Sequence, residues 1–225
     1  MKLRYLHLLF FFISFSALGQ KEKKIFPSNI DIHLMPLAVA HPDPSIRIGS
    51  EYMTSGRWSY GLSLGAGFNQ VLSNPPGWPK AKDSDKYRMF EIRPEVKYYW
   101  FRRDAMGWYV ALEGVLMSRK NKFLNRSHYL DDSNEIHFDQ ADFSKSKAGL
   151  IGKIGGKFLI KKRLTIDFYT GLGLANTNVK YLNVVNPVAG RSDHFFELEN
   201  YYPGKKITPL IAVGLKLGFR VWEKE

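Results

Sequence analysis

The fold is decided by residues 207–221, which read ITPLIAVGLKLGFRV. The odd-numbered positions carry large apolar side chains almost throughout, whereas the even-numbered positions are mostly small or charged, among them Lys216 and Arg220. Because a strand sends alternate side chains to opposite faces, this period of two predicts a long strand with one apolar face. A helix would scatter the two cations among different neighbours, and Gly214 and Gly218 would weaken its interior.

The same alternation recurs along most of the chain. It predicts about eight strands, at residues 30–37, 46–53, 58–68, 90–101, 108–117, 147–160, 164–175 and 207–221. Most of these segments have the length that a tilted strand requires to cross a membrane. Pro94 lies inside one of them, and because proline has no N–H for the strand ladder, we expect a β-bulge there.

The links between these segments alternate in length. Residues 54–57, 102–107 and 161–163 are short links, whereas the polar loops expected at 71–87, 118–142 and 180–206 are long. A closed antiparallel up-and-down transmembrane β-barrel explains this order, because its short turns lie on one side of the membrane and its long loops on the other. A soluble β-sandwich gives no reason for it.

The N-terminal segment has the features of a cleaved signal peptide. Lys2 and Arg4 precede an apolar run, and small residues at 17 and 19 form a cleavage site. The apolar run is too short to cross about 30 Å of hydrocarbon, which argues against a retained membrane helix. We therefore expect a signal peptide at residues 1–19, a short periplasmic segment at 20–28 and the barrel at 29–222.

Composition excludes several classes of protein. The 225 residues contain no cysteine, so disulfides and thiolate metal sites are excluded. Lys and Arg number 33 against 21 Asp and Glu, but these cations form no basic stripe or binding motif, so we expect no nucleic-acid partner.

The charged face of the predicted strands would line the barrel interior. Seven cations and six carboxylates lie on it, so the interior nearly neutralises itself. Buried charges persist when they are paired, so we predict a non-conducting interior filled by ion pairs. The predicted set is Asp31, Arg47, Glu51, Glu91, Arg93, Glu95, Lys97, Glu113, Lys153, Lys157, Asp167, Lys216 and Arg220. Inward glycines are expected to leave room for large side chains from the opposite wall.

Aromatic residues gather at the turn-side ends of the predicted strands. Such rings favour the level of the lipid headgroups, which predicts an aromatic girdle. Its members are Trp58, Tyr98, Trp100, Trp108, Phe158, Phe219 and Trp222.

Five segments resemble a known class of protein. They are RIGSEYMTSGRWSYGLSLGAGF at 47–68, EIRPEVKYYWF at 91–101, GWYVALEGVLM at 107–117, GKFLIKKRLTIDFYTGLGLA at 156–175 and LIAVGLKLGFRV at 210–221. They are similar to the small eight-stranded outer-membrane barrels of Gram-negative bacteria, above all to uncharacterised families of the Bacteroidota. The resemblance implies a bacterial outer-membrane location with both termini periplasmic, and contacts with outer-membrane lipids and the outer-membrane insertion machinery. It supplies no functional residues.

One polar loop contains residues that suggest chemistry. The stretch NRSHYLDDSNEIHFDQAD at 125–142 could hold a divalent cation, although it lacks the ordered ligand spacing of a calcium loop. It could also hold the Ser-His-acid group of a lipid hydrolase, but nothing in the sequence fixes a base against Ser127. The candidate residues are Ser127, His128, Asp131, Asp132, Glu135, His137, Asp139 and Asp142.

The favoured hypothesis is a monomeric structural or surface-interaction protein that acts through its extracellular loops. It has no catalytic, cofactor-binding or metal-binding residues, and its surface partner is not identified. Two alternatives stay open: an outer-membrane enzyme of the lipid A hydrolase type, and a soluble periplasmic barrel for an apolar ligand. The charged interior argues against the second.

Overall fold

A computed structural model of the chain describes residues 27–41, 43–68, 84–129, 134–191 and 202–224. These residues form nine strands and one short 3-10 helix. The elements are β1 (Asn29–Leu34), η1 (Pro36–Ala40), β2 (Ile46–Met53), β3 (Trp58–Phe68), β4 (Ser84–Arg102), β5 (Met106–Tyr129), β6 (Asn134–Ile160), β7 (Leu164–Val185), β8 (Val188–Arg191) and β9 (Gly204–Glu223). No helix among the described residues is long and apolar enough to cross a membrane.

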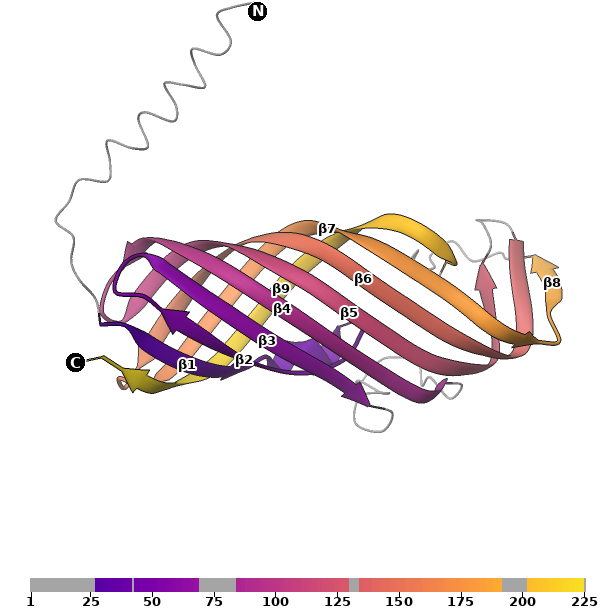
Figure 1. The fold of residues 1–225 in the computed structure, drawn as a ribbon, viewed down its shortest axis with the longest axis horizontal. Coiled ribbons are helices and arrows are strands. Elements are labelled where there is room, and N and C mark those ends of the chain that lie inside the picture. The colour runs from indigo at the N-terminus through magenta and orange to yellow at the C-terminus, as the bar shows by residue number, and fades with distance from the viewer. Residues whose placement is uncertain (1–26, 42, 69–83, 130–133, 192–201, 225) are drawn as a thin grey trace, which may run out of the picture.

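Eight of the strands form a closed ring of backbone hydrogen bonds. Strands β1 to β7 pair in chain order, β7 pairs with β9, and β9 pairs with β1, always antiparallel. Figure 1 shows these strands inclined to the long axis of the molecule, with β8 at one end. The backbone N–H of Lys224 donates to Ser28 O at 2.8 Å, so both described ends of the chain lie at the opposite end, which we call the turn end.

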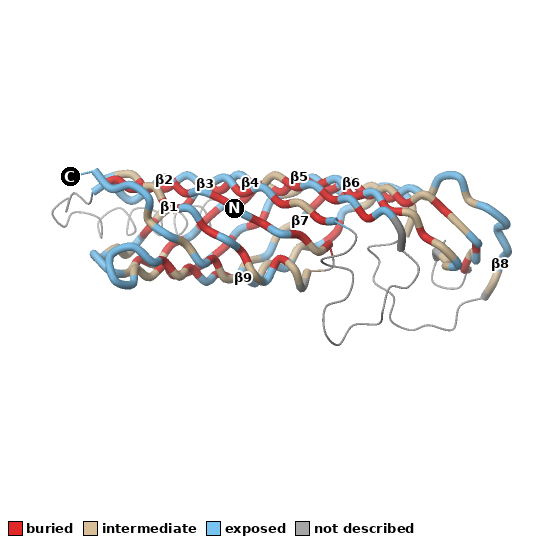
Figure 2. The backbone as a smooth tube through the Cα atoms, turned by 90° about the horizontal axis from the view of Figure 1, so that it is seen from below, coloured by how far each residue is buried: buried red, intermediate tan, exposed pale blue. Residues whose placement is uncertain are grey.

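Buried and exposed residues alternate along the strands (Figure 2). In β2 the pattern is strict, with Arg47 and Glu51 buried and Ile48 exposed. The enclosed side of the ring is therefore rich in charge and the outer side in apolar side chains. This distribution is the reverse of the one in a soluble globular domain.

The short links occur where the sequence predicts them. Residues 161–163 join β6 to β7, and the backbone N–H of Arg163 closes that turn on Ile160 O at 3.3 Å. Thr54 closes the turn between β2 and β3 by donating its N–H and its hydroxyl to Trp58 O.

The prediction of a loop over the whole of residues 118–142 is wrong. Strand β5 continues to Tyr129 and β6 begins at Asn134, so most of the segment is a long hairpin. The loop expected at 180–206 is likewise partly strand, because β7 continues to Val185 and is followed by β8. The strand predictions relied on apolar residues alternating with polar ones. In these extensions many outward residues are polar too, so the alternation is absent. The expected loop at 71–87 lies largely outside the described residues, although β4 already begins at Ser84.

The extended strands form what we call the projection: residues 124–129, 134–141 and 180–191, beyond the ends of β4 and β9. An apolar cluster lies at its base, with tilted aromatic rings in contact. Its buried members are Phe123, Phe138, Ala141, Phe143 and Val179. This second core explains why the hairpin extends so far.

Two prolines depart from expectation. Strand β1 ends at Leu34 rather than at 37, because the chain enters η1 with Pro36 in its first turn. The bulge expected at Pro94 is absent: Pro94 pairs in continuous register with Leu62. On its other side the proline ring lies against Gly114, where a Cβ would be 3.1 Å from Pro94 Cγ, so the neighbouring strand makes room for the ring.

Inward glycines do receive large side chains, but from adjacent strands. Gly214 pairs with Tyr169, whose ring covers the space where a Cβ would lie. Gly155 accommodates the ring of Tyr109 in the same way. The glycines therefore let tyrosines lie flat along the inner wall instead of projecting across it.

Candidate functional site

The enclosed side of the ring carries one connected network of ion pairs, which is the candidate functional site. It includes every charged residue that the sequence placed on this face. These are Asp31, Arg47, Glu51, Glu91, Arg93, Glu95, Lys97, Glu113, Lys153, Lys157, Asp167, Lys216 and Arg220.

Lys97 of β4 lies at the centre of this network. Its Nζ is 3.0 Å from Glu51 Oε2, 2.6 Å from Asp167 Oδ2 and 3.6 Å from Glu95 Oε2. The side chain is 1% exposed. Strands β2, β4 and β7 thus send charges across the interior to one ammonium group, which occupies the space between them.

The network continues toward the turn end through Lys157. Its Nζ is 2.9 Å from Glu51 Oε2 and 2.7 Å from Asp31 Oδ2. Arg220 Nε then donates to Asp31 Oδ1 at 3.3 Å, linking the first and last strands of the ring.

Toward the other end the network passes through Glu95. Its carboxylate accepts from Lys216 Nζ at 2.5 Å and from Lys153 Nζ at 3.0 Å. Lys153 also bonds Glu113, which Arg93 Nη1 contacts at 2.8 Å.

The last members of the network meet at Glu91. Its Oε2 is 2.7 Å from Arg93 Nε, and its Oε1 is 2.5 Å from Arg47 Nη2. Each carboxylate of the network therefore has a cation partner. Because its charges are paired, the network is suited to stabilising the interior.

Hydroxyl groups that the sequence reading missed complete the network. Ser59 Oγ and Tyr99 OH donate to Glu51 Oε1 at 2.6 and 3.1 Å. Tyr109 OH donates to Asp167 Oδ1 at 2.6 Å. Tyr99 follows the inward Lys97 by two residues and Tyr109 precedes the inward Glu113 by four, so the same period of two was the available signal for the two tyrosines.

A second charge cluster lies where the β1–β2 link folds over the ring. Asp43 is 2% exposed and accepts from Arg119 Nη1, Lys145 Nζ and Lys147 Nζ at 2.9 to 3.2 Å. Burial opposes the charged form of Asp43, but these cations outweigh it and hold the pKa of the carboxyl well below its usual range. No periodicity marks a single acid in a short link, so the sequence could not assign Asp43.

His41 lies in the same link. The pKa of its ring is lowered from 6.5 to about 4, chiefly by burial; Asp43 opposes this shift, and nearby cations add to it. The backbone N–H of Asp43 donates to His41 Nδ1 at 3.3 Å, which requires that nitrogen to be unprotonated.

The aromatic residues predicted as a girdle lie on the outer side of the ring, near the turn end. Trp58 and Tyr98 have ring centroids 5.1 Å apart. Trp108 and Phe158 form an edge contact at 6.0 Å, and both contact Phe168, which the sequence prediction omitted. The exposed members are Trp58, Trp100, Phe219 and Trp222, with 42 to 48% of each residue accessible.

The chemistry suggested for residues 125–142 finds partial geometric support. Ser127 and His137 are direct cross-strand partners, and His137 Nδ1 is 3.8 Å from Glu135 Oε1. No hydrogen bond joins Ser127 to His137 in the described part of the chain. Asp131 and Asp132 lie outside it, and within it no three His, Asp or Glu side chains gather as metal ligands.

A comparison with known protein families gives a match. Residues 74–202, more than half of the chain, match the family described as "Protein of unknown function (DUF3575)". No curated protein and no solved structure matches the chain.

Proposed function

The chain therefore belongs to the DUF3575 family, and from this premise we propose that it is a β-barrel of the bacterial outer membrane. The observation that carries the proposal is the reversed polarity of the ring. Ile207, Ile211, Val213 and Leu172 are each more than 70% exposed on the outer side, while the charges are enclosed. Soluble monomers rarely expose large continuous apolar patches, and lipid chains would remove this surface from water.

The proposed orientation follows from the two ends of the ring. Short turns and both described ends lie at the turn end, which would face the periplasm after removal of a signal peptide at residues 1–19. The projection would then face the cell exterior. Outer-membrane lipids and the insertion machinery are the proposed partners, together with an unidentified surface ligand.

The proposed role is structural or interactive, without conduction. The connected ion pairs occupy the interior, so a continuous water path would have to break several of them. The projection extends beyond the ends of β4 and β9, with Leu182, Val185 and Val188 among its exposed side chains, and it is the part available to a surface partner. The protein would act as a monomer without a cofactor.

Cell fractionation combined with surface proteolysis tests this proposal. We expect the full chain in the outer-membrane fraction, with cleavage of intact cells confined to the projection and neighbouring links. In planar bilayers the purified protein should give no steady conductance, unlike a porin measured alongside it. Recovery in the soluble periplasmic fraction would refute the membrane location, and stable porin-like currents would refute the closed interior.

A lipid-modifying enzyme is the second candidate, favoured by the cross-strand placement of Ser127 and His137 beside Glu135. Its test is the mass spectrum of lipid A from cells that express the wild type or Ser127→Ala. Loss of an acyl chain that depends on Ser127 would make this the leading function. Identical spectra, our expectation, would remove it.

A further inference from the structure

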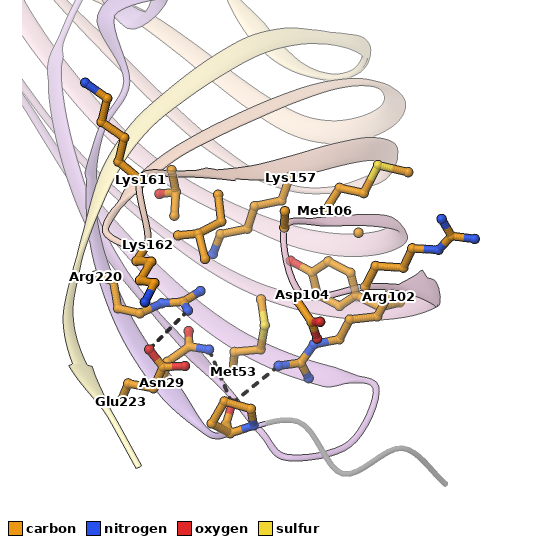
Figure 3. A pocket seen from close by; sticks show the side chains of 17 residues that line it. Asn29, Met53, Arg102, Asp104, Met106, Lys157, Lys161, Lys162, Arg220 and Glu223 are labelled. Carbon is orange, nitrogen blue, oxygen red and sulfur yellow. Dashed lines mark hydrogen bonds and ion pairs between the residues drawn. The ribbon is translucent and has the colours of Figure 1, made fainter. Parts of the chain in front are cut away.

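A cavity of about 680 Å³ opens at the turn end of the ring (Figure 3). Its walls come from the ends of β1 and β9, from the β4–β5 turn and from the β6–β7 turn. Its volume lies within the range of small-molecule sites, and the charge network closes its inner side. The network thus makes it a cup rather than an entrance.

Cationic side chains dominate its lining. Asp104 and Glu223 are the only carboxylates among the lining residues, against six cations: Arg102, Arg103, Lys157, Lys161, Lys162 and Arg220. Figure 3 shows Lys161, Lys162 and Arg220 on one side and Arg102 on the other. The cup therefore presents positive charge from two opposing walls.

Several of these cations are available to a ligand. Lys157 and Arg220 belong to the ion-pair network, but Arg103, Lys161 and Lys162 have no ion pair with any carboxylate in the described residues. Arg102 Nη1 is held at the mouth by the backbone carbonyls of Thr54 and Gly56, at 2.8 and 2.5 Å.

The backbone of the two lysines departs from local preference. Lys161 has φ of 49° and Lys162 has φ of 66°, the left-handed conformation at both central positions of the β-turn that residues 160–163 form. Asn-Gly and Asp-Gly fit such turns best, and lysine in this region is strained. The geometry of the turn therefore does not explain why lysine occupies these two positions.

Asn29 adds a hydrogen-bond acceptor to the wall. The residue is 1% exposed and lines the cavity, and its Nδ2 donates to Pro27 O at 3.4 Å. Its buried Oδ1 receives no hydrogen bond from the described residues. A buried acceptor without a donor is unfavourable, so a ligand that supplies an N–H would be favoured here.

We propose that this cup binds an acidic peptide segment. Carboxylates spaced along a peptide can meet the cations of both walls at once. Backbone N–H groups of the peptide supply the donor that Asn29 Oδ1 lacks. The inference does not depend on the membrane location; if that location holds, the cup faces the periplasm.

Binding of a fluorescent hexaglutamate peptide to the full chain in detergent micelles tests the proposal by anisotropy. The variant Lys161→Asn with Lys162→Gly removes two charges and installs the preferred turn sequence, so it should fold at least as well as the wild type. The control, Lys120→Gln with Lys180→Gln, removes two exposed charges far from the cup. We expect the turn variant to weaken binding by at least about tenfold and the control to change it by less than about twofold.

Each other outcome overturns the proposal. Equal losses in both variants would show attraction to net charge alone, and no binding by the wild type would show that the cup is not a site. Displacement of the peptide by an equimolar concentration of inorganic phosphate would show a small-anion site instead. The urea midpoint of each variant, measured in the same micelles, verifies that lost binding is not lost folding.

Discussion

Glu95 illustrates at the scale of one residue how a charge is accommodated inside the ring. Its two oxygens face three ammonium groups, those of Lys97, Lys153 and Lys216. Desolvating a carboxylate is unfavourable by several kcal/mol, and close, hydrogen-bonded cations are required to offset that free energy. The same carboxylate therefore keeps three cations buried.

Glu95→Leu should destabilise the protein by about 3–5 kcal/mol, because it leaves buried cations uncompensated while barely changing side-chain volume. The measurement is the free energy of unfolding by urea in micelles. Adding Lys216→Leu to the same variant should recover part of the loss, since one orphaned cation is removed with its partner. An unchanged urea midpoint in Glu95→Leu would indicate that water already solvates these charges.

His41 should make the β1–β2 link sensitive to acid. Its folded pKa of about 4 lies below the ordinary 6.5, so between these values the unfolded chain binds a proton that the folded chain does not. The free energy of unfolding therefore falls as the pH drops through this window. His41→Gln should flatten the profile there, measured by urea unfolding at several pH values.

At lower pH, protonation of Asp43 makes the free energy of unfolding fall further in both the wild type and His41→Gln, because the pKa of Asp43 is lowered in the folded chain. Superimposable profiles would contradict the assignment.

At the scale of the element, the hairpin of β5 and β6 differs from the other hairpins. Its strands continue beyond β4 and β9, and their support comes from the aromatic cluster at the base of the projection. Phe143 is 1% exposed there and lies 4.9 Å, between ring centroids, from Phe123. This cluster at the base of the projection is thus separate from the one formed by Met53, Tyr99, Tyr109, Ala111 and Tyr169 inside the ring.

Phe143→Ala should loosen the projection and spare the ring. Removing a buried phenylalanine destabilises its surroundings by about 3–5 kcal/mol, and here those surroundings are local. Amide hydrogen exchange should accelerate in residues 134–145 while the amides of β2 and β3 keep their protection. Leu182→Ala, on an exposed position of the same region, is the matched control and should change little.

The contrast between these elements explains what the sequence could predict. Strands at 46–53 and 58–68 and the turn at 161–163 were predicted at their observed bounds, because apolar and polar residues alternate up to the turn residues. The thirteen charged residues that the alternation placed inside lie in the ion-pair network, but the buried cations around Asp43, which are Arg119, Lys145 and Lys147, were not among them. The alternation failed beyond residue 118, where both faces of the strands carry polar residues and a strand resembles a loop.

Other misses have a different physical origin. Pro94 lies in regular register because Gly114 on the neighbouring strand accommodates its ring, a long-range fit that local sequence does not reveal. Asp43 is held by cations more than 70 residues away in the sequence. Pairings between distant segments depend on the closed topology, so they became visible only with the structure.

At the scale of the whole molecule, the exposed apolar side chains on the outer side of the ring are the feature whose energetics depend on whether water or lipid surrounds the protein. Val213 lies near the middle of β9 with 71% of the residue exposed. In water, replacing such a side chain by arginine changes stability by less than about 0.5 kcal/mol. In a bilayer the same replacement near the midplane is unfavourable by about 2–4 kcal/mol.

Val213→Arg therefore distinguishes the two environments. We expect it to lower the yield and stability of folding into lipid bilayers, measured by the fraction that keeps its folded electrophoretic mobility. Ser146→Arg, which places the same charge at an exposed polar position, should fold like the wild type. Equal behaviour of the two variants would mean that the outer face does not meet lipid.

Closure of the ring also constrains the order of events during folding. The contact between Asp31 and Arg220 joins residues 189 positions apart, and strand β1 pairs with β9, the last strand of the described residues. Until β9 pairs with β1, the partly folded sheet has two open edges, and such edges promote aggregation. Contacts of this range also make folding slow, because the entropy of the whole loop is lost before they form. A chain truncated before β9 would therefore be expected to accumulate as an aggregation-prone open sheet.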